Sequence, residues 1–277
     1  MAGGANVPES RGSDLPMNAD VRHPTRLPGA VLRERSYAAG CTQPRHHHAR
    51  TSVTLVFGGS LEEDVGAARE LAGPLSVVFK PAGTEHSDRV GPSGAVTLQL
   101  ELDDDVVDGP GEPVRPEDWG WSHGGAASRR FLDLVCGARD DEPEVELEER
   151  LLDLLGTLRP GSGVGERPDP APGWLARVAE ELDDTFADPR RVRELARDVS
   201  VHPVALARAH RRHFGCSITG RLRARRVREA AALLRAGGCS LSSVAFRTGF
   251  ADQSHFTRVF RTETGLTPGA YRSLLAG

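Results

Sequence analysis

Lysine, paired cysteines and long apolar runs are nearly or wholly absent from this sequence of 277 residues. Lys80 is the single lysine among 35 basic residues, so arginine supplies almost all of the positive charge. The four cysteines (Cys41, Cys136, Cys216 and Cys239) form no Cys-x-x-Cys pair and no zinc spacing, which argues against a zinc module. Scattered single thiols suit a reducing compartment.

Apolar residues nowhere approach the run of about 18 that a membrane-spanning helix requires. The first residues, MAGGANVPESRGSDLPMNAD, also lack the apolar core of a secretory signal. We therefore expect a soluble cytoplasmic protein.

Charge is divided unevenly along the chain, although its overall value is only -4. Residues 174–277 contain 18 arginines and 10 acidic residues, a net charge of +8, whereas residues 1–173 carry -12. An acidic half joined to a basic half indicates one polyanion-binding domain and one domain with another role. A local positive face matters more than the overall charge, because phosphate contacts supply much of the affinity of DNA binders.

The N-terminal half has the pattern of short strands. Residues 1–24 are polar and rich in Gly, Pro and Asn, so we expect them to be disordered. Residues 52–57 form an apolar run that ends at two glycines, residues 75–79 form another that ends at a Pro-Ala-Gly turn, and residues 95–102 alternate at period two. Strands separated by Gly/Pro turns predict a sandwich or barrel.

Two amphipathic helices are expected next, at residues 127–137 and 144–158. They are equally compatible with packing on the β domain and with a dimer interface. The following segment, 159–173, is a Pro/Gly/Ser-rich linker with little to bury. We therefore predict a domain at 25–158 and a second domain at 174–277.

The C-terminal segment shows only helical patterns. Its expected helices are 174–184, 189–198, 203–214, 217–236, 241–248, 252–264 and a short one beginning at 268. Two pairs of short helices are each joined by a tight turn, as in a helix-turn-helix unit. The helix between the pairs has about 20 residues and spans roughly 30 Å, close to the spacing of about 34 Å between successive major grooves. One chain could therefore present both units to adjacent grooves.

The residues that connect these patterns to a known family are AFRTGFADQSHFTRVFR at 245–261 and GLTPGAYR at 265–272. This ordered run resembles the signature of the AraC/XylS family of transcription regulators, and a weaker upstream match runs in register from Leu195 to Arg226. The resemblance covers about 100 residues. It implies two DNA-binding helix-turn-helix units preceded by a cupin-like sensor.

Candidate DNA-binding residues follow from the exposed helix faces and from that resemblance. They are Val204, Ala205, Arg208, Arg211 and Arg212 in the first unit, and Gln253, Ser254, His255, Thr257, Arg258 and Arg261 in the second. The first unit departs from the family, because His210 replaces the usual Phe and small residues occupy reading positions. Arg208 is its best candidate for reading a base.

Alternative roles remain for several of these side chains. Arg211, Arg212 and Arg261 suit phosphate contacts or a solvated face better than base recognition. His255 is as compatible with a capping or packing role as it is with DNA contact. Two arginines of the long helix, Arg225 and Arg226, could instead form ion pairs with Glu229 or Asp198.

A histidine-rich region of the N-terminal half is the candidate effector pocket. The segment from Gly40 to His48 and the segment from Pro81 to His86 resemble the two cupin motifs, in which three histidines and a glutamate hold a metal. The glutamate is missing here, since Ser52 and Val53 occupy its place. We favour a metal-free pocket for a small organic effector near His46, His48 and His86, and we expect no metal and no cofactor. A divalent metal or a plain barrel rim are the alternatives.

The fold expected is thus a two-domain α+β protein, with a cupin-like β-barrel and its helices followed by an all-α domain with two helix-turn-helix units. The function expected is sequence-specific transcription regulation in response to a small molecule, without catalysis. Expected partners are double-stranded DNA, the effector and a second copy of the chain, with RNA polymerase as a further candidate. The alternatives are a metal-dependent cupin enzyme fused to a DNA-binding domain, and an architectural protein that binds DNA without sequence preference.

Overall fold

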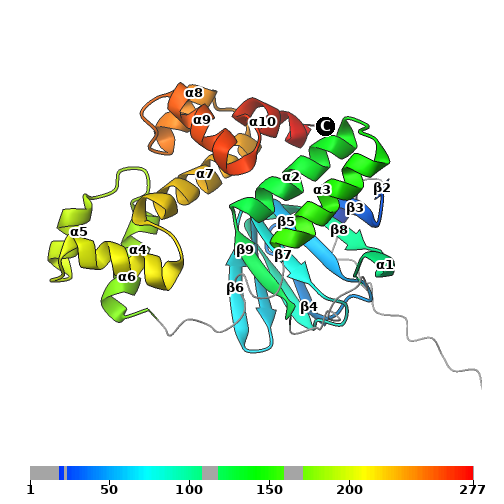
Figure 1. The fold of residues 1–277 in the computed structure, drawn as a ribbon, viewed down its shortest axis with the longest axis horizontal. Coiled ribbons are helices and arrows are strands. Elements are labelled where there is room, and N and C mark those ends of the chain that lie inside the picture. Colours follow the sequence, from blue (N-terminus) through cyan, green and yellow to red (C-terminus); the bar gives the residue numbers. More distant parts are fainter. Residues whose placement is uncertain (1–18, 22–23, 108–117, 159–170, 277) are drawn as a thin grey trace, which may run out of the picture.

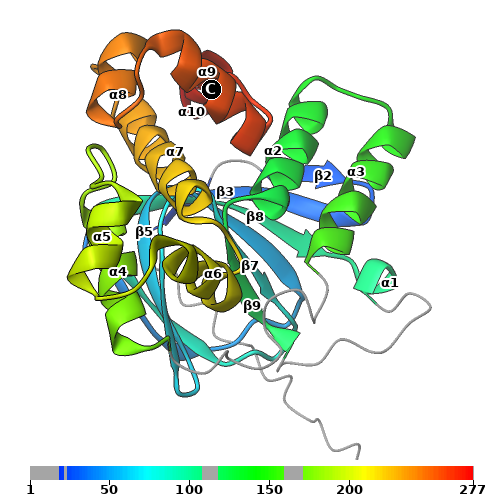
Figure 2. The ribbon, with the colours of Figure 1, turned by 60° about the vertical axis from the view of Figure 1, so that its left-hand side comes forward.

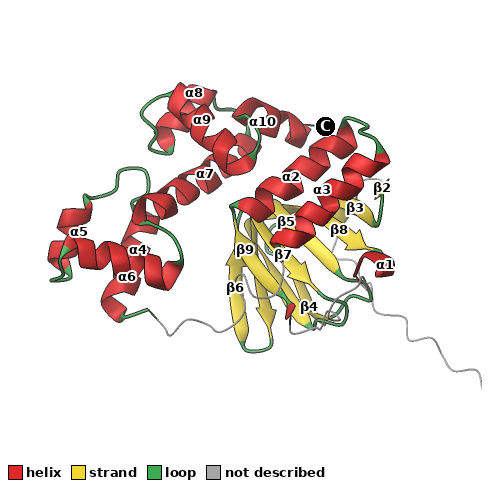
Figure 3. Cartoon of the chain, viewed as in Figure 1, coloured by secondary structure: helices red, strands yellow, loops and turns green. Residues whose placement is uncertain are grey.

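The computed structural model describes residues 19–21, 24–107, 118–158 and 171–276, which form an antiparallel β-sheet, two helices packed on it and a helical C-terminal region (Figure 1 and Figure 3). The strands are β1 (Ala19–Val21), β2 (Thr25–Leu27), β3 (Ala30–Tyr37), β4 (Thr42–His46), β5 (Ser52–Val65), β6 (Ala68–Ala72), β7 (Ser76–Lys80), β8 (His86–Leu102) and β9 (Gly120–His123). The helices are α1 (Asp104–Val107), α2 (Ala126–Arg139), α3 (Glu144–Thr157), α4 (Gly173–Asp184), α5 (Val192–Asp198), α6 (Pro203–Phe214), α7 (Ile218–Ala236), α8 (Leu241–Arg247), α9 (Gln253–Thr264) and α10 (Pro268–Ala276).

The sheet is built around two long strands, β5 and β8. Its order is β1-β3-β8-β5-β7-β9, with β2 paired to β3, β4 to β8 and β6 to β5. All of these pairings are antiparallel. Each long strand pairs with different neighbours along its length, so it must bend between them. The expectation of a β-rich first domain is confirmed, and the observed pairings describe a sheet whose edge strands do not close on each other.

Strand β5 corrects the sequence analysis, which ended this strand at Phe57. The strand continues through Gly58 and Gly59 to Val65, with shifts of register against β8 on either side of the glycines. Gly59 has φ +74°, and a Cβ there would lie 1.9 Å from the carbonyl oxygen of Gly94. The glycines therefore form bulges that bend the strand where two backbones approach closely.

The N-terminal segment differs partly from the disorder expected over residues 1–24. Residues Ala19–Val21 form β1, which pairs with β3. Residues 1–18 and 22–23, like residues 159–170 of the linker expected at 159–173, lie outside the described residues. The predicted disorder is therefore wrong for the three residues of β1.

Helices α2 and α3 cover one end of the sheet (Figure 2). Their buried residues include Phe131, Leu132, Leu151 and Leu154, which belong to the same core as the sheet. The apolar faces of both helices therefore pack on the β-sheet. Val145 of α3, with an exposed fraction of 75%, remains on the surface.

The helix ends in the C-terminal region follow from local chemistry. The Asp252 carboxylate accepts a hydrogen bond from the His255 backbone N–H at 2.7 Å, as its predicted N-cap role requires. Gly215 and Gly265 end α6 and α9 in the left-handed conformation. Helix α5 begins at Val192 rather than at Pro189. Among the described helices, none combines the length and the apolar character needed to cross a membrane.

The two helix-turn-helix units belong to different cores. The first unit, α5 and α6, packs with α4 around Leu175, Leu195 and Leu206. The second unit, α8 and α9, shares one core with the sheet and α2, to which it contributes Phe256 and Phe260. Helix α7 joins the two units (Figure 1).

Contacts between the second unit and the sheet are specific. The buried Tyr271 hydroxyl of α10 donates a hydrogen bond to the Phe57 carbonyl oxygen at 3.0 Å, and the two rings lie 4.8 Å apart. Burial raises the pKa of Tyr271 well above its usual range, so the phenol stays a donor. Arg139 of α2 also donates to the Leu274 carbonyl oxygen at 3.0 Å. Helices α9 and α10 are therefore fixed against the N-terminal domain.

Candidate nucleic-acid interface

The outward face of α6 carries all five candidates of the first unit. Val204, Ala205, Arg208, Arg211 and Arg212 are exposed. Val204 and Ala205 lie in the first turn after the His202 N-cap, where Pro203 starts the helix. The face thus offers three arginines and two small apolar side chains, which fits phosphate contact better than dense base recognition.

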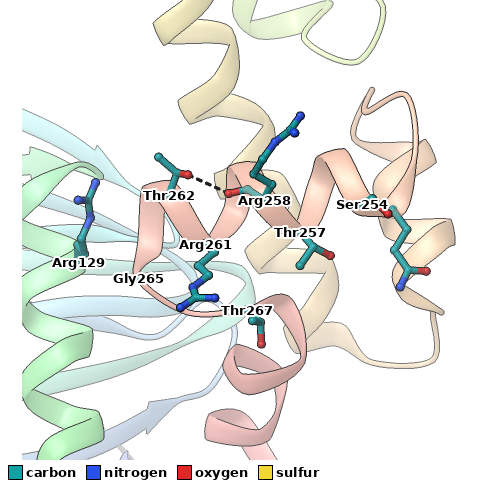
Figure 4. Close-up of a pocket in the computed structure, with 9 residues that line it drawn as sticks. Arg129, Ser254, Thr257, Arg258, Arg261, Thr262, Gly265 and Thr267 are labelled. Carbon is teal, nitrogen blue, oxygen red and sulfur yellow. Dashed lines mark hydrogen bonds between the residues drawn. The ribbon is translucent and has the colours of Figure 1, made fainter.

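The outward face of α9 is richer in hydrogen-bonding side chains. Gln253, Ser254, Arg258 and Arg261 are exposed, and Thr257 is half-buried. They line an open hollow of about 760 Å³ (Figure 4). Five of the six residues predicted for this unit are therefore brought together on one face, with donors and acceptors of the kind that read base edges.

His255, the sixth, packs rather than lining the hollow. Its ring lies 5.5 Å from that of Phe250 in an edge-on arrangement, and the side chain is half-buried. Phe250, Phe256 and Phe260 are buried, as the sequence predicts for core residues. The packing interpretation of His255 is the one the geometry favours.

Arginines of α7 are engaged mostly within the protein. Arg225 pairs with Glu229 at 2.9 Å, as expected. Arg226, however, donates to the Phe186 carbonyl oxygen at 2.8 Å, and Asp198 pairs with Arg190 at 2.6 Å. The expectation that Arg226 forms an ion pair with Glu229 or Asp198 is therefore wrong, because its guanidinium instead holds the loop after α4.

His210, the departure from the family pattern in α6, is a core residue. Its side chain is fully buried, and Nδ1 donates to the Cys216 carbonyl oxygen at 2.8 Å. Burial lowers the pKa of His210, and Nε2 is buried without a hydrogen-bond partner in the described part of the chain. A neutral imidazole thus takes the place of the phenyl ring expected at this position.

The three histidines of the candidate effector pocket do meet. Their ring centroids lie 4.2 Å (His46 to His86), 4.9 Å (His46 to His48) and 5.1 Å (His48 to His86) apart. Nδ1 of His46 bonds to the Pro44 carbonyl oxygen and Nδ1 of His86 to that of Thr84, both at 2.9 Å. Those bonds place the imidazole proton on Nδ1 and leave each Nε2 as a free lone pair. Burial lowers the pKa of His48 and of His86 to about 3, so both rings are neutral near pH 7.

Two carboxylates that the sequence analysis missed lie beside this cluster. His86 Nε2 is 3.6 Å from Asp88 Oδ2 and 4.0 Å from Glu63 Oε1. Glu63 is buried and bonds to Lys80 Nζ at 2.5 Å and to Trp121 Nε1 at 2.7 Å. Glu63 lies on the buried face of β5 together with Leu61 and Val65, which are two positions away on either side. This signal is hidden once the strand is ended at Phe57. Both carboxylates, Lys80, Trp121 and His48 line an adjacent cavity of about 50 Å³.

Comparison with known proteins identifies the helical region. Residues 195–273 match the family profile described as "Helix-turn-helix domain". The chain is 32% identical over 145 residues to the HTH-type transcriptional regulator GlxA of Rhizobium meliloti, covering 52% of this chain and 41% of the relative. It is 29% identical over 141 residues to the HTH-type transcriptional activator RhaS of Escherichia fergusonii, covering 51% and 50%.

Among solved structures, ToxT of Vibrio cholerae aligns with 89% of this chain and 98% of its own, at 12% identity and a TM-score of 0.37. Of the curated relatives named above, by contrast, the chain spans half of the length or less. The profile match begins in α5 and ends in α10, and so includes both units and α7. Residues 195–273 of this chain are therefore a helix-turn-helix domain.

Proposed function

We propose that this protein regulates transcription by binding a specific DNA sequence through α6 and α9. The observation that carries the proposal is the set of Gln253, Ser254, Thr257, Arg258 and Arg261 on one open face of a helix-turn-helix unit. The relatives named as transcriptional regulators support it. In this proposal Arg258 reads a base, while Arg211, Arg212 and Arg261 contact phosphates.

A two-groove arrangement follows from the length of the connecting helix. Helix α7 has 19 residues and is therefore about 28 Å long. The first unit, with Arg208 as its main reader, occupies one major groove and the second unit the next, about 34 Å away. One chain then covers about two turns of duplex.

Competition binding tests the specificity of the proposed interaction. A labelled duplex recovered from a random pool by the full chain is challenged with scrambled duplex at fixed salt. A regulator requires about 10³-fold or more excess of scrambled DNA for displacement. Displacement at equal concentrations would instead identify an architectural protein without sequence preference, the second interpretation of the same fold.

The N-terminal domain, proposed as residues 25–158, is the sensor and the site of dimerisation in this account. We assign it a cupin-like sheet with an effector pocket at His46, His48 and His86. The charged groups beside the histidines and the small adjacent cavity favour a polar effector of few atoms. Binding shifts the orientation of α9, because the second unit packs on this domain. An effector that changed neither DNA affinity nor dimer state would contradict the assignment.

A metal ion is a second candidate for this pocket, and one observation favours it. The ligand atoms of His46, His48 and His86 lie within 4.8 Å of one another, and the Nε2 atoms of His46 and His86 are buried without partners among the described residues. One of the two carboxylates beside the cluster, Glu63, is already bonded to Lys80 and Trp121, which weakens the fit. Metal analysis after purification distinguishes the two: one ion per chain, lost in His86→Ala, supports the metal, and less than one tenth of an ion excludes it.

The remaining assignments follow from a regulatory role. The protein acts in the cytoplasm, where bacterial DNA is located, and RNA polymerase is a further candidate partner. We assign it no catalytic step, in keeping with relatives named as regulators.

A further inference from the structure

The hollow over α9 has a wall that does not come from the helix-turn-helix domain. Arg129 of α2, in the N-terminal domain, lines it together with Gln253, Arg258 and Arg261 of α9. Figure 4 shows Arg129 beside the C-terminal end of α9, where Thr262 and Gly265 lie. Of the residues that line this hollow, Arg129 alone precedes the linker, so the sensor domain contributes directly to the face that α9 presents.

The position of Arg129 is fixed by packing. A Cβ at Gly265, which has φ +83°, would lie 3.2 Å from Arg129 Cγ, so the aliphatic stem of Arg129 rests against the end of α9. Two hydrogen bonds cross the same interface, one from the Tyr271 hydroxyl to the Phe57 carbonyl and one from Arg139 to the Leu274 carbonyl, each 3.0 Å long. Arg129 therefore keeps its place relative to α9 as long as the two domains remain packed.

The guanidinium of Arg129 is exposed and makes no ion pair with any residue in the described ranges. Its neighbour Arg130 differs, since it pairs with Asp153 of α3 at 2.9 Å. Together with Arg258 and Arg261 of α9, Arg129 gives the wall of this hollow three guanidinium groups. The arrangement is favourable when a polyanion covers all three.

Groove dimensions indicate which part of a duplex meets Arg129. Helix α9 has 12 residues and is about 18 Å long, whereas the major groove is about 12 Å wide. If the N-terminal half of α9 reads bases, its C-terminal end extends past the groove to the sugar-phosphate rim. Arg129 lies at that end.

We infer that Arg129 contacts a backbone phosphate of the DNA that α9 reads, so that the N-terminal domain forms part of the DNA-binding surface. The inference rests on the proposed function of α9. It adds a sequence-independent contact that exists only while the second unit is packed on the sensor domain. An effector that separated the two would therefore weaken DNA binding through the loss of this contact as well.

The salt dependence of binding by the full chain tests the inference. Arg129→Gln removes the charge and keeps most of the stem, Arg129→Lys keeps the charge, and Arg130→Gln is the matched control on the same helix. For Arg129→Gln, the slope of log affinity against log salt is expected to fall by about 0.9, the value for one phosphate. The affinity advantage of the unmodified chain then shrinks about threefold between 50 and 200 mM salt, equally on selected and scrambled duplexes. Arg129→Lys and Arg130→Gln keep the original slope.

Two results would overturn the inference. One is an unchanged slope in Arg129→Gln, and the other is a loss confined to the selected duplex, which would make Arg129 a base contact. Failure of the proposed function has a different signature, because the unmodified chain would then bind selected and scrambled duplexes equally. The slope comparison can still be made in that case.

Discussion

Helix α6 of the first unit packs in a small core shared with α4 and α7, whereas α9 of the second packs in a core that includes the β-sheet. The reading faces differ as well. Pro203 and Val204 occupy the first two positions of α6, where α9 has Gln253 and Ser254. The unit with the richer set of hydrogen-bonding side chains is thus the one fixed to the proposed sensor.

This difference suggests a division of labour. A change in the N-terminal domain can reach α9 through α2, which packs against it, and through Tyr271 of α10, which bonds to Phe57. The elements that pack against α6 are instead α4, α5 and α7. We therefore expect the second unit to supply most of the specificity and to respond first to an effector. We expect the first unit to supply phosphate contacts and one base contact, from Arg208.

The largest predicted effect follows from removing the link between α10 and the sheet. Tyr271→Ala deletes a buried aromatic ring and leaves the Phe57 carbonyl without its donor, so the free energy of unfolding should fall by about 3–5 kcal/mol. Hydrogen exchange should show reduced protection in both β5 and α9. Loss confined to α10 would contradict the shared core.

The matched change in the first unit is Leu206→Ala, which opens a cavity in the smaller core. We expect a loss of about 2–5 kcal/mol, seen in hydrogen exchange as reduced protection of α4, α5 and α6. Protection of β5 and α9 should be unchanged. Equal loss of protection in all five elements would mean that the two units unfold together.

Truncation of one arginine in each unit sharpens the comparison of specificity. Arg258→Ala should weaken binding by about 1–3 kcal/mol on the selected duplex and by less on variants altered at one position. Arg208→Ala should have a smaller and less selective effect, because its neighbours in the preceding turn of α6, Val204 and Ala205, cannot hydrogen-bond to bases through their side chains. The measurement is equilibrium binding to a panel of single-substitution duplexes. A larger or more selective loss for Arg208→Ala would reverse the assignment.

A smaller effect concerns acid stability of the first unit. Burial holds the pKa of His210 below its ordinary value of about 6.5. Below that pH the unfolded chain binds a proton that the folded chain does not, so stability falls as the pH decreases. His210→Phe should remove this dependence, as measured by denaturant unfolding between pH 7 and pH 5. Parallel pH profiles for the two proteins would show that His210 does not contribute.

The sequence predicted the helical domain closely because its signals are local. Asp252, Gly215 and Gly265 define helix ends through caps within a few residues, and the predicted bounds of α6 agree with the structure. The exposed face of α9 follows from its period of 3.6 residues. Five of its six predicted site residues line the hollow for the same reason.

The sheet and the pocket were less predictable because their determinants are distant in sequence. Gly58 and Gly59 suggest a turn, and only pairing with β8 shows that they are bulges within a strand. That error conceals Glu63, whose partners Lys80 and Trp121 come from other strands. The contact between Tyr271 and Phe57 joins residues 214 positions apart, and no local pattern indicates it.

Selection of bound duplexes from a random pool by the full chain tests the central claim most directly. The account predicts two enriched segments centred about 10 base pairs apart, one strongly specified and the other weakly specified. Arg258→Ala should relax the strong segment and leave the weak one unchanged. A pool without any enriched sequence, or two segments of equal information, would contradict the claim that α9 carries the specificity of this protein.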